Sequence, residues 1–257
     1  MANTSHFKRR VPCGRVLLGD GMPKICVPLM GKSPQEMRAL TDAAVHSGAD
    51  VLEWRIDALS PLPTPDRLQP MHDAVRASAG TTPLLMTLRT ARDGGSGSAD
   101  PAAYEQLLCA LARARLCDAL DVEWSAGRGR FERIVQAAHD QGLCVVGSSH
   151  DFSGTPDEQE ITSRLFGMES SGADVCKIAV MPHNRRDVLT LMQACISADE
   201  QLEAPLIAIA MGPLGVITRI GGAFMGSCLT FGTAGQASAP GQIDTLKLRA
   251  ALEVFHA

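Results

Sequence analysis

The sequence predicts an α/β fold, a single (β/α)8 barrel of the TIM type with a short N-terminal hairpin closing one end. Eight short apolar runs rich in Val, Ile and Leu alternate with longer segments of helical periodicity, which is the pattern of repeated βα units. The tetrapeptide GADV occurs at residues 48–51 and again at 172–175, each time where a helix would lead into a strand. Eight such units in 257 residues match one barrel, about 250 residues, better than a doubly wound sheet, which usually has fewer strands.

The apolar runs give the expected strands in chain order. They are KICVPLM (24–30), DVLEWRID (50–57), PLLMTLRT (83–90), ALDVEWS (119–125), LCVVGSSHDF (143–152), DVCKIAVMP (174–182), PLIAIAMG (205–212) and SCLTFGT (227–233). Helices are expected between them, with clear signals at residues 33–48, 100–116, 130–142, 157–172 and 184–200. Several of these segments open with Ser, Asp or Asn and close with Gly, the usual cap residues.

The remaining segments are expected to be loops or to close the barrel. Residues 1–23, which include RVLLGDGMP, predict a hairpin across one end. The segments GGSGSADP (94–101) and TAGQASAPGQ (233–242) have the composition of mobile loops. Since no Pro/Gly/Ser-rich linker divides the chain, residues 1–257 are expected to form one domain.

Composition excludes several classes of partner. The net charge of -4 comes from 24 basic and 28 acidic residues without a basic block, so nucleic acid is not an expected partner. The eight cysteines form no CxxC pair, and several lie in apolar runs, which fits a reducing cytoplasm better than a disulfide framework. No signal peptide and no run of 18 apolar residues is present, so a membrane is not expected either.

Lys177 is the sharpest chemical signal, because it stands inside the apolar run VCKIAVM. Burial disfavours the ammonium form and lowers the pKa of a lysine, so that the neutral amine becomes a nucleophile. The alternative is a structural ion pair with a carboxylate such as Glu53 or Glu123. The position therefore predicts either a nucleophilic amine or a buried ion pair.

Charged residues at the carboxyl ends of other strands are further candidates, because functional side chains of a barrel project there. In EWRID, strand alternation places Glu53, Arg55 and Asp57 on one face, where they either enter the barrel mouth or pair with one another. Arg89 ends the third strand and is placed to clamp an anionic or hydroxylated ligand, and Asp93 follows in a Gly-flanked turn, where a carboxylate can orient a histidine.

His150 ends the fifth apolar run, one strand before Lys177, and this position makes it a candidate acid and base. Taken alone, such a histidine is more often structural. Arg219 lies in an apolar helix start and needs an anionic partner, while the loop that contains Ser238 and Gln242 is a candidate lid. For Glu123, structural pairing is the expected role.

Together these features describe imine chemistry on a small anionic carbonyl compound. No cofactor is expected, because the substrate carbonyl, once converted to an iminium, can itself accept electrons. The sequence has no phosphate-binding GxGxxG or Walker loop, and its seven histidines include no HxxxH or HExxH spacing for a metal.

Six motifs resemble the type I 3-dehydroquinate dehydratase family, the Schiff-base dehydratases of the shikimate pathway. They are EWRID (53–57), LRTARDGG (88–95), SSHDF (148–152), ADVCKIAVMP (173–182), VITRIGGAFMGSCLTFG (216–232) and ASAPGQI (237–243). The resemblance spans about residues 24–243. It implies a (β/α)8 barrel, usually a homodimer, that converts 3-dehydroquinate to 3-dehydroshikimate by syn elimination of water.

The resemblance also implies a role for each matching residue. Lys177 corresponds to the lysine that condenses with the substrate ketone, and His150 to the histidine that removes the α proton and protonates the departing hydroxyl. Arg219 corresponds to the ligand of the substrate carboxylate. The residues that hold the ring hydroxyls and the reacting end of the substrate correspond to Glu53, Arg55 and Arg89. The contacts of the closing loop correspond to Ser238 and Gln242.

Two positions depart from the family pattern. Asp93 stands where members commonly have a glutamate that pairs with the catalytic histidine, so its carboxylate is one methylene shorter. Pro28 stands where some members have a serine near the ligand, and that contact is expected to be lost.

Two other functions stay open: a class I aldolase, which would cleave a C–C bond and usually binds phosphate through Gly-rich backbone, and a catalytically idle barrel that binds a metabolite for regulation.

Overall fold

The computed structural model describes residues 9–59, 61, 64–97, 100–235 and 238–255. Within these ranges eight parallel strands form the barrel: β3 (Lys24–Leu29), β4 (Val51–Arg55), β5 (Leu84–Thr87), β6 (Ala119–Glu123), β7 (Cys144–Asp151), β8 (Val175–Val180), β9 (Leu206–Ala210) and β10 (Leu229–Thr233). Each lies inside one of the eight apolar runs, so the predicted strands are confirmed.

The strands pair in an order that curls the sheet on itself. The ladder begins at β10, which pairs with β3, and then follows chain order to β9. One parallel bridge between Leu206 and Ser227 joins β9 to the start of β10 and closes the ring. A further two-residue strand, β11 (Ile243–Asp244), pairs with the last two residues of β10 on the side away from β3 and was not predicted.

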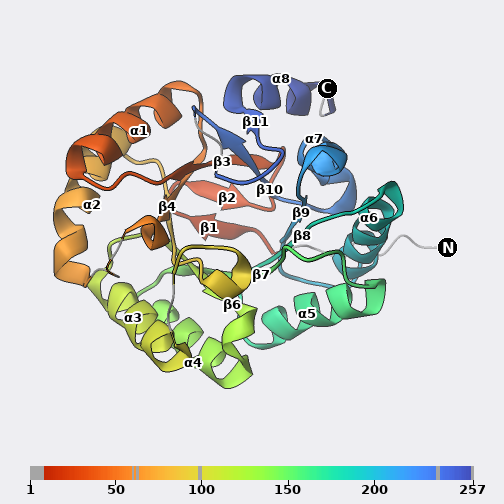
Figure 1. Ribbon diagram of the computed structural model, residues 1–257, viewed down its shortest axis with the longest axis horizontal. Coiled ribbons are helices and arrows are strands. Elements are labelled where there is room, and N and C mark those ends of the chain that lie inside the picture. The colour runs from red at the N-terminus through yellow and green to blue at the C-terminus, as the bar shows by residue number, and fades with distance from the viewer. Residues whose placement is uncertain (1–8, 60, 62–63, 98–99, 236–237, 256–257) are drawn as a thin grey trace.

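Helices cover the outside of the barrel (Figure 1). They are α1 (Pro34–His46), α2 (Pro65–Ala79), α3 (Pro101–Ala114), α4 (Arg128–His139), α5 (Glu158–Ser170), α6 (Arg185–Asp199), α7 (Val216–Ile220) and α8 (Thr245–Phe255). The five helices with clear sequence signals are all present. Polar side chains cap several of them: Ser33 and Asp157 each accept from a backbone amide three residues on, and Asn184 forms a capping box with Asp187.

Strand alternation divides the core in two. Outward-facing strand residues pack against the helices, whereas inward-facing ones such as Val51, Ala119 and Val175 fill the amino-terminal half of the barrel. The predicted hairpin, β1 (Val11–Cys13) and β2 (Val16–Leu18), adds Val11 and Leu18 to this inner core. Because the hairpin closes that end, a ligand has to enter from the carboxyl ends of the strands.

The composition also gave predictions about the cysteines and about a membrane. Seven of the eight cysteines are buried, as their apolar contexts predict. None of the helices in the described ranges has the length and apolar character needed to span a membrane.

Candidate active site

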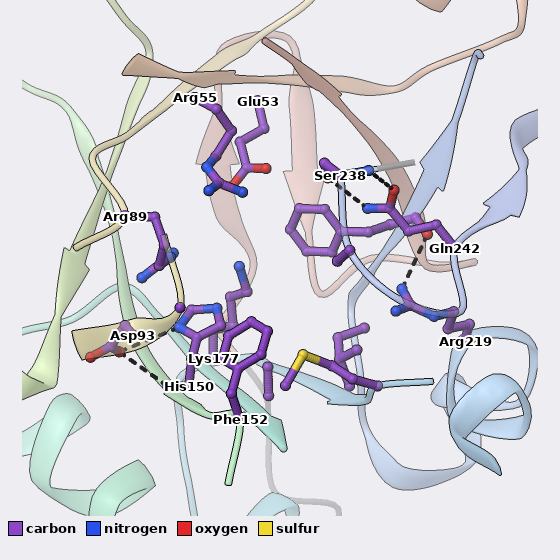
Figure 2. A pocket seen from close by; sticks show the side chains of 16 residues that line it. Glu53, Arg55, Arg89, Asp93, His150, Phe152, Lys177, Arg219, Ser238 and Gln242 are labelled. Carbon is purple, nitrogen blue, oxygen red and sulfur yellow. Dashed lines mark hydrogen bonds and ion pairs between the residues drawn. The ribbon is translucent and has the colours of Figure 1, made fainter. Parts of the chain in front are cut away.

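A pocket opens at the carboxyl ends of the strands, and Figure 2 shows its lining. Its sixteen lining residues include nine candidates from the sequence: Glu53, Arg55, Arg89, Asp93, His150, Lys177, Arg219, Ser238 and Gln242. An apolar wall of Phe152, Ala179, Ile209, Met211 and Phe231 completes it, and sequence reasoning missed this wall. The inward positions of β8, β9 and β10 would have indicated most of it.

Lys177 projects from β8 into the barrel and is almost completely buried. Its Nζ atom lies 4.4 Å from the centroid of the Phe231 ring and 3.8 Å from Asp121 Oδ2. Burial lowers the pKa of Lys177, and the negative charges of Asp121 and Glu53 only partly oppose this. An amine in this setting loses its proton more readily than a lysine in water.

The ion-pair alternative for Lys177 named the wrong partner, because the paired carboxylate is Asp121 rather than Glu53 or Glu123. Asp121 lies on β6, two residues before Glu123, so the same strand alternation would have placed both side chains inside the barrel. Glu53 instead accepts a hydrogen bond from Thr87 Oγ1 at 2.9 Å.

His150 faces the same space from β7, and its side chain is buried beside Asp93. Asp93 Oδ2 lies 3.2 Å from the backbone nitrogen of His150, a hydrogen bond, and 3.5 Å from Nδ1 of the imidazole. Burial holds the pKa of His150 well below 6.5, with further lowering from Arg89 and Lys177. Burial also raises the pKa of Asp93, so this carboxyl does not offset the lowering, and the imidazole is neutral at pH 7.

Arg89 lines the pocket, but protein groups already hold its guanidinium. Its Nη1 donates to Glu123 Oε1 and Ser148 Oγ at 3.0 Å each, and its Nη2 donates to Asp121 Oδ2 at 2.9 Å. These carboxylates hold the pKa of Arg89 above its usual value. Glu123 also accepts from the Thr90 amide and hydroxyl, and burial raises its pKa to about 7.

Arg55 and Glu53 point into the pocket from β4 (Figure 2), whereas Asp57 does not line it. The prediction that all three share one strand face was wrong for Asp57, because the strand ends at Arg55 and a 3₁₀ turn, Ile56–Ala58, follows. Asp57 folds back and accepts two hydrogen bonds from Arg55, each of 2.8 Å. The pairing expected within EWRID therefore holds Arg55 at the rim.

Arg219, at the far side of the pocket in Figure 2, has no ion pair among the described residues. Its side chain is buried and donates to two backbone carbonyls, Phe231 O at 3.4 Å and Pro240 O at 3.0 Å, while its Nε has no partner. Burial without a counter-charge lowers the pKa of Arg219 to about 10. A buried guanidinium without a counter-charge can bind an anion.

The loop after β10 lies beside Arg219. Ser238 and Gln242 bind each other twice: the Ser238 amide donates to Gln242 Oε1 at 2.8 Å, and Gln242 Nε2 donates to Ser238 Oγ at 3.0 Å. Pro240 O also accepts from the Gly212 amide at 3.2 Å, which ties the loop to the end of β9. Pro28 pairs with Glu53 in the β3–β4 ladder and is not part of the pocket lining.

A buried lysine beside a neutral histidine, facing an unpaired arginine at the mouth of a (β/α)8 barrel, defines the class of barrel enzymes that can form an imine with an anionic carbonyl compound. The comparisons with known proteins specify the family. The family model described as type I 3-dehydroquinase matches residues 25–257, and the chain belongs to this family.

Individual relatives cover nearly the whole chain. A protein named 3-dehydroquinate dehydratase from Listeria monocytogenes is 39% identical over 247 residues, which are 96% of this chain and 98% of that protein. The crystal structure of a type I 3-dehydroquinate dehydratase from Clostridium difficile superposes with a TM-score of 0.92 at 35% identity, covering 97% and 99% of the two chains. The enzyme from Geobacillus kaustophilus also gives 0.92, at 32% identity with 97% of each chain covered.

Proposed function

We propose that this chain is a dehydratase that converts 3-dehydroquinate to 3-dehydroshikimate and water, the third step of the shikimate pathway, through a Schiff base on Lys177. Membership of the type I family and relatives named 3-dehydroquinate dehydratase support the reaction. The observation that carries the mechanism is the buried Lys177 amine in a pocket whose opposite wall holds the unpaired Arg219.

The proposed reaction begins when the neutral Lys177 amine attacks the substrate ketone. With uptake of one proton water leaves and a cationic imine forms, and that proton is released again when the product imine is hydrolysed. This cation acidifies the adjacent C–H bond, and neutral His150 removes that proton. The imidazolium then protonates the departing hydroxyl, so the elimination releases one water. Hydrolysis of the product imine takes back the water of the first step and frees Lys177.

The remaining residues are proposed to bind and orient the substrate. Arg219 pairs with the substrate carboxylate, and Glu53, Arg55 and Arg89 hold the ring hydroxyls and the reacting end. Ser238 and Gln242 close over the ring and exclude water from the imine. Asp93 orients His150.

Borohydride trapping tests the mechanism. Reduction in the presence of 3-dehydroquinate is expected to leave a stable adduct on the peptide that contains Lys177, detected by mass spectrometry. Lys177→Ala should give no adduct, whereas Lys247→Ala, which changes an exposed lysine of α8, should be labelled like the wild type. Wild-type protein that turns over substrate without a trapped adduct would exclude the Schiff base. Product analysis separates this reaction from C–C cleavage by an aldolase.

We also propose that residues 1–257 act as one catalytic domain in a cytoplasmic homodimer. The exposed apolar side chains Ile217, Phe224 and Leu246, on the adjoining elements α7, Gly222–Met225 and α8, support a subunit contact. Light scattering after size exclusion should give a dimer for the wild type and a monomer for Phe224→Ser. An unchanged mass in that variant would place the contact elsewhere, and cell fractionation tests the location.

A further inference from the structure

Asp121 is a fully buried carboxylate beneath the pocket, and it is not part of the pocket lining. It comes from β6, while Lys177 comes from β8, two strands along the barrel. Alternate strands of a barrel contribute side chains to the same interior layer. The strand between them, β7, places Ser148 opposite Lys177 in its ladder.

Each carboxylate oxygen of Asp121 has its own partners. Oδ1 accepts a hydrogen bond from Ser148 Oγ at 2.6 Å. Oδ2 accepts from Arg89 Nη2 at 2.9 Å and lies 3.8 Å from Lys177 Nζ. The distance to Lys177 is that of an ion pair but exceeds that of a hydrogen bond, so Asp121 stabilises the ammonium by its charge.

Asp121 is the strongest of the neighbouring charges that favour the ammonium form of Lys177. Glu53 on β4 acts in the same direction more weakly, whereas Arg89 opposes them. Cys26 on β3 is a neutral thiol, because burial raises its pKa well above the usual value. His150 on β7 is neutral, and the Phe231 ring on β10 is polarisable but uncharged. From β9, apolar Ile207 and Ile209 complete the surroundings.

We propose that Asp121 is a positioning residue that acts through Lys177. Its carboxylate keeps the Lys177 amine charged between turnovers and then neutralises the cationic imine that forms on it. This inference rests on the proposed role of Lys177 as the imine-forming residue. Because Asp121 lies outside the pocket lining, the substrate does not contact it, and its influence passes through the Lys177 nitrogen. Ser148 orients the carboxylate through Oδ1, and Arg89 holds Oδ2, the oxygen that faces Lys177.

The first test measures the charge of Lys177 without substrate. Reductive methylation by formaldehyde requires the neutral amine, so its rate at the Lys177 peptide, followed by mass spectrometry against pH, reports the titration of that residue. In Asp121→Asn the midpoint is expected to fall by about 1–3 pH units, since loss of an opposite charge at this distance lowers the pKa of an amine.

Glu123→Gln is the matched control. It also removes a buried carboxylate that pairs with Arg89, at 3.0 Å, but Glu123 has Thr90 rather than Lys177 as its other partner. The midpoint for Lys177 should stay within about 0.3 pH units of the wild type there, because Glu123 is not among the groups that shift the pKa of Lys177. An unchanged midpoint in Asp121→Asn, or an equal shift in both variants, would overturn the inference.

Ser148→Ala provides a second variant if Asp121→Asn does not fold. It leaves every charge in place but removes the 2.6 Å hydrogen bond that orients the carboxylate, so a smaller downward shift of the Lys177 midpoint is expected. No shift in a folded Ser148→Ala protein would contradict the inference.

Turnover then separates the inference from the proposed function. In Asp121→Asn, kcat for 3-dehydroquinate is expected to fall at least about tenfold while KM changes less than about threefold, because Arg219 and the rim are intact. If the wild type gives no borohydride adduct but Asp121→Asn still shifts the Lys177 midpoint, the proposed reaction is rejected and the control of Lys177 by Asp121 is supported. A wild-type adduct without a midpoint shift in Asp121→Asn would do the reverse.

Discussion

Asp93 contacts His150 at two points, the backbone nitrogen at 3.2 Å and Nδ1 of the ring at 3.5 Å. The shorter side chain of an aspartate therefore reaches the histidine. Gly94 makes this approach possible: it has a positive φ of 80°, and a Cβ atom there would lie 2.2 Å from the ring of Phe152. The loop packs directly beneath that ring, which brings the Asp93 carboxylate to β7.

Asp93→Asn is expected to lower kcat for 3-dehydroquinate. Asp93 makes no hydrogen bond to the ring, but its carboxylate lies 3.5 Å from Nδ1 and stabilises the imidazolium by its charge. An opposite charge this close shifts a pKa by about 1–3 units, so its loss should cost at least about 10- to 100-fold in rate. Steady-state kinetics provide the measurement, and Asp93→Glu, which keeps the charge, is the control. If Asp93→Asn turns over like the wild type, the orientation of His150 depends on burial alone.

His150→Ala separates imine formation from elimination. Lys177 keeps its buried site in this variant, so borohydride should still trap an adduct, although slowly. Elimination should fall by several orders of magnitude, because a positioned acid or base contributes about 10²–10⁴-fold in each role. Comparing single-turnover trapping with product release measures the two steps. Near-normal turnover would remove His150 from the proposed scheme.

The pH profile of kcat reports the same histidine in the enzyme–substrate complex, where Lys177 is held in the imine and no longer titrates. A base acts in its neutral form, and burial, Arg89 and Lys177 hold the pKa of His150 well below 6.5. Activity should therefore persist as pH falls through 6.5 and decline only at lower pH, where the imidazole takes up a proton. An acid limb with its midpoint at or above pH 6.5 would show that the imidazole is not buried in the working enzyme.

The barrel could be predicted from the sequence because its signals are local and repeated. Each strand is an apolar run between segments with helical periodicity, and inward and outward residues alternate along it. Lys177, His150 and Glu53 could therefore be assigned to the pocket without a structure. The partners of these residues could not, because they come from other strands. That Asp121 rather than Glu53 pairs with Lys177 depends on strand stagger, which the pattern of one strand does not contain.

Two other results illustrate the same limit. The prediction for Asp57 assumed that the strand continues, whereas the chain turns at Ile56 and the Asp57 carboxylate forms an ion pair with Arg55. The arginine at 89 was expected to be available to a ligand, and its three protein partners became visible only once β6 and β7 were placed beside it. For Arg219, the sequence indicated an anion, and the structure leaves its guanidinium without one.

Arg219→Met is expected to weaken substrate binding and stabilise the fold. Loss of the carboxylate ligand should raise KM by about 10²-fold, the equivalent of two charge-assisted hydrogen bonds. Removal of a buried, unpaired charge should raise Tm by about 2 °C or more. Arg55→Met is the contrast, because it leaves the buried Asp57 carboxylate with two backbone amides but without its cationic partner, and it should lower Tm. A lower Tm in both variants would show that Arg219 has a structural anion.

The hairpin offers a test of the closed end, because neighbouring leucines on β2 have opposite environments. Leu18 is buried in the inner core at 2% exposure, whereas Leu17 is 40% exposed. Leu18→Ala should cost about 2–5 kcal/mol in the free energy of unfolding, since it removes core contacts and leaves a cavity. Leu17→Ala should cost less than about 0.5 kcal/mol. Urea denaturation measures both, and equal small effects would mean that the barrel is stable without its hairpin.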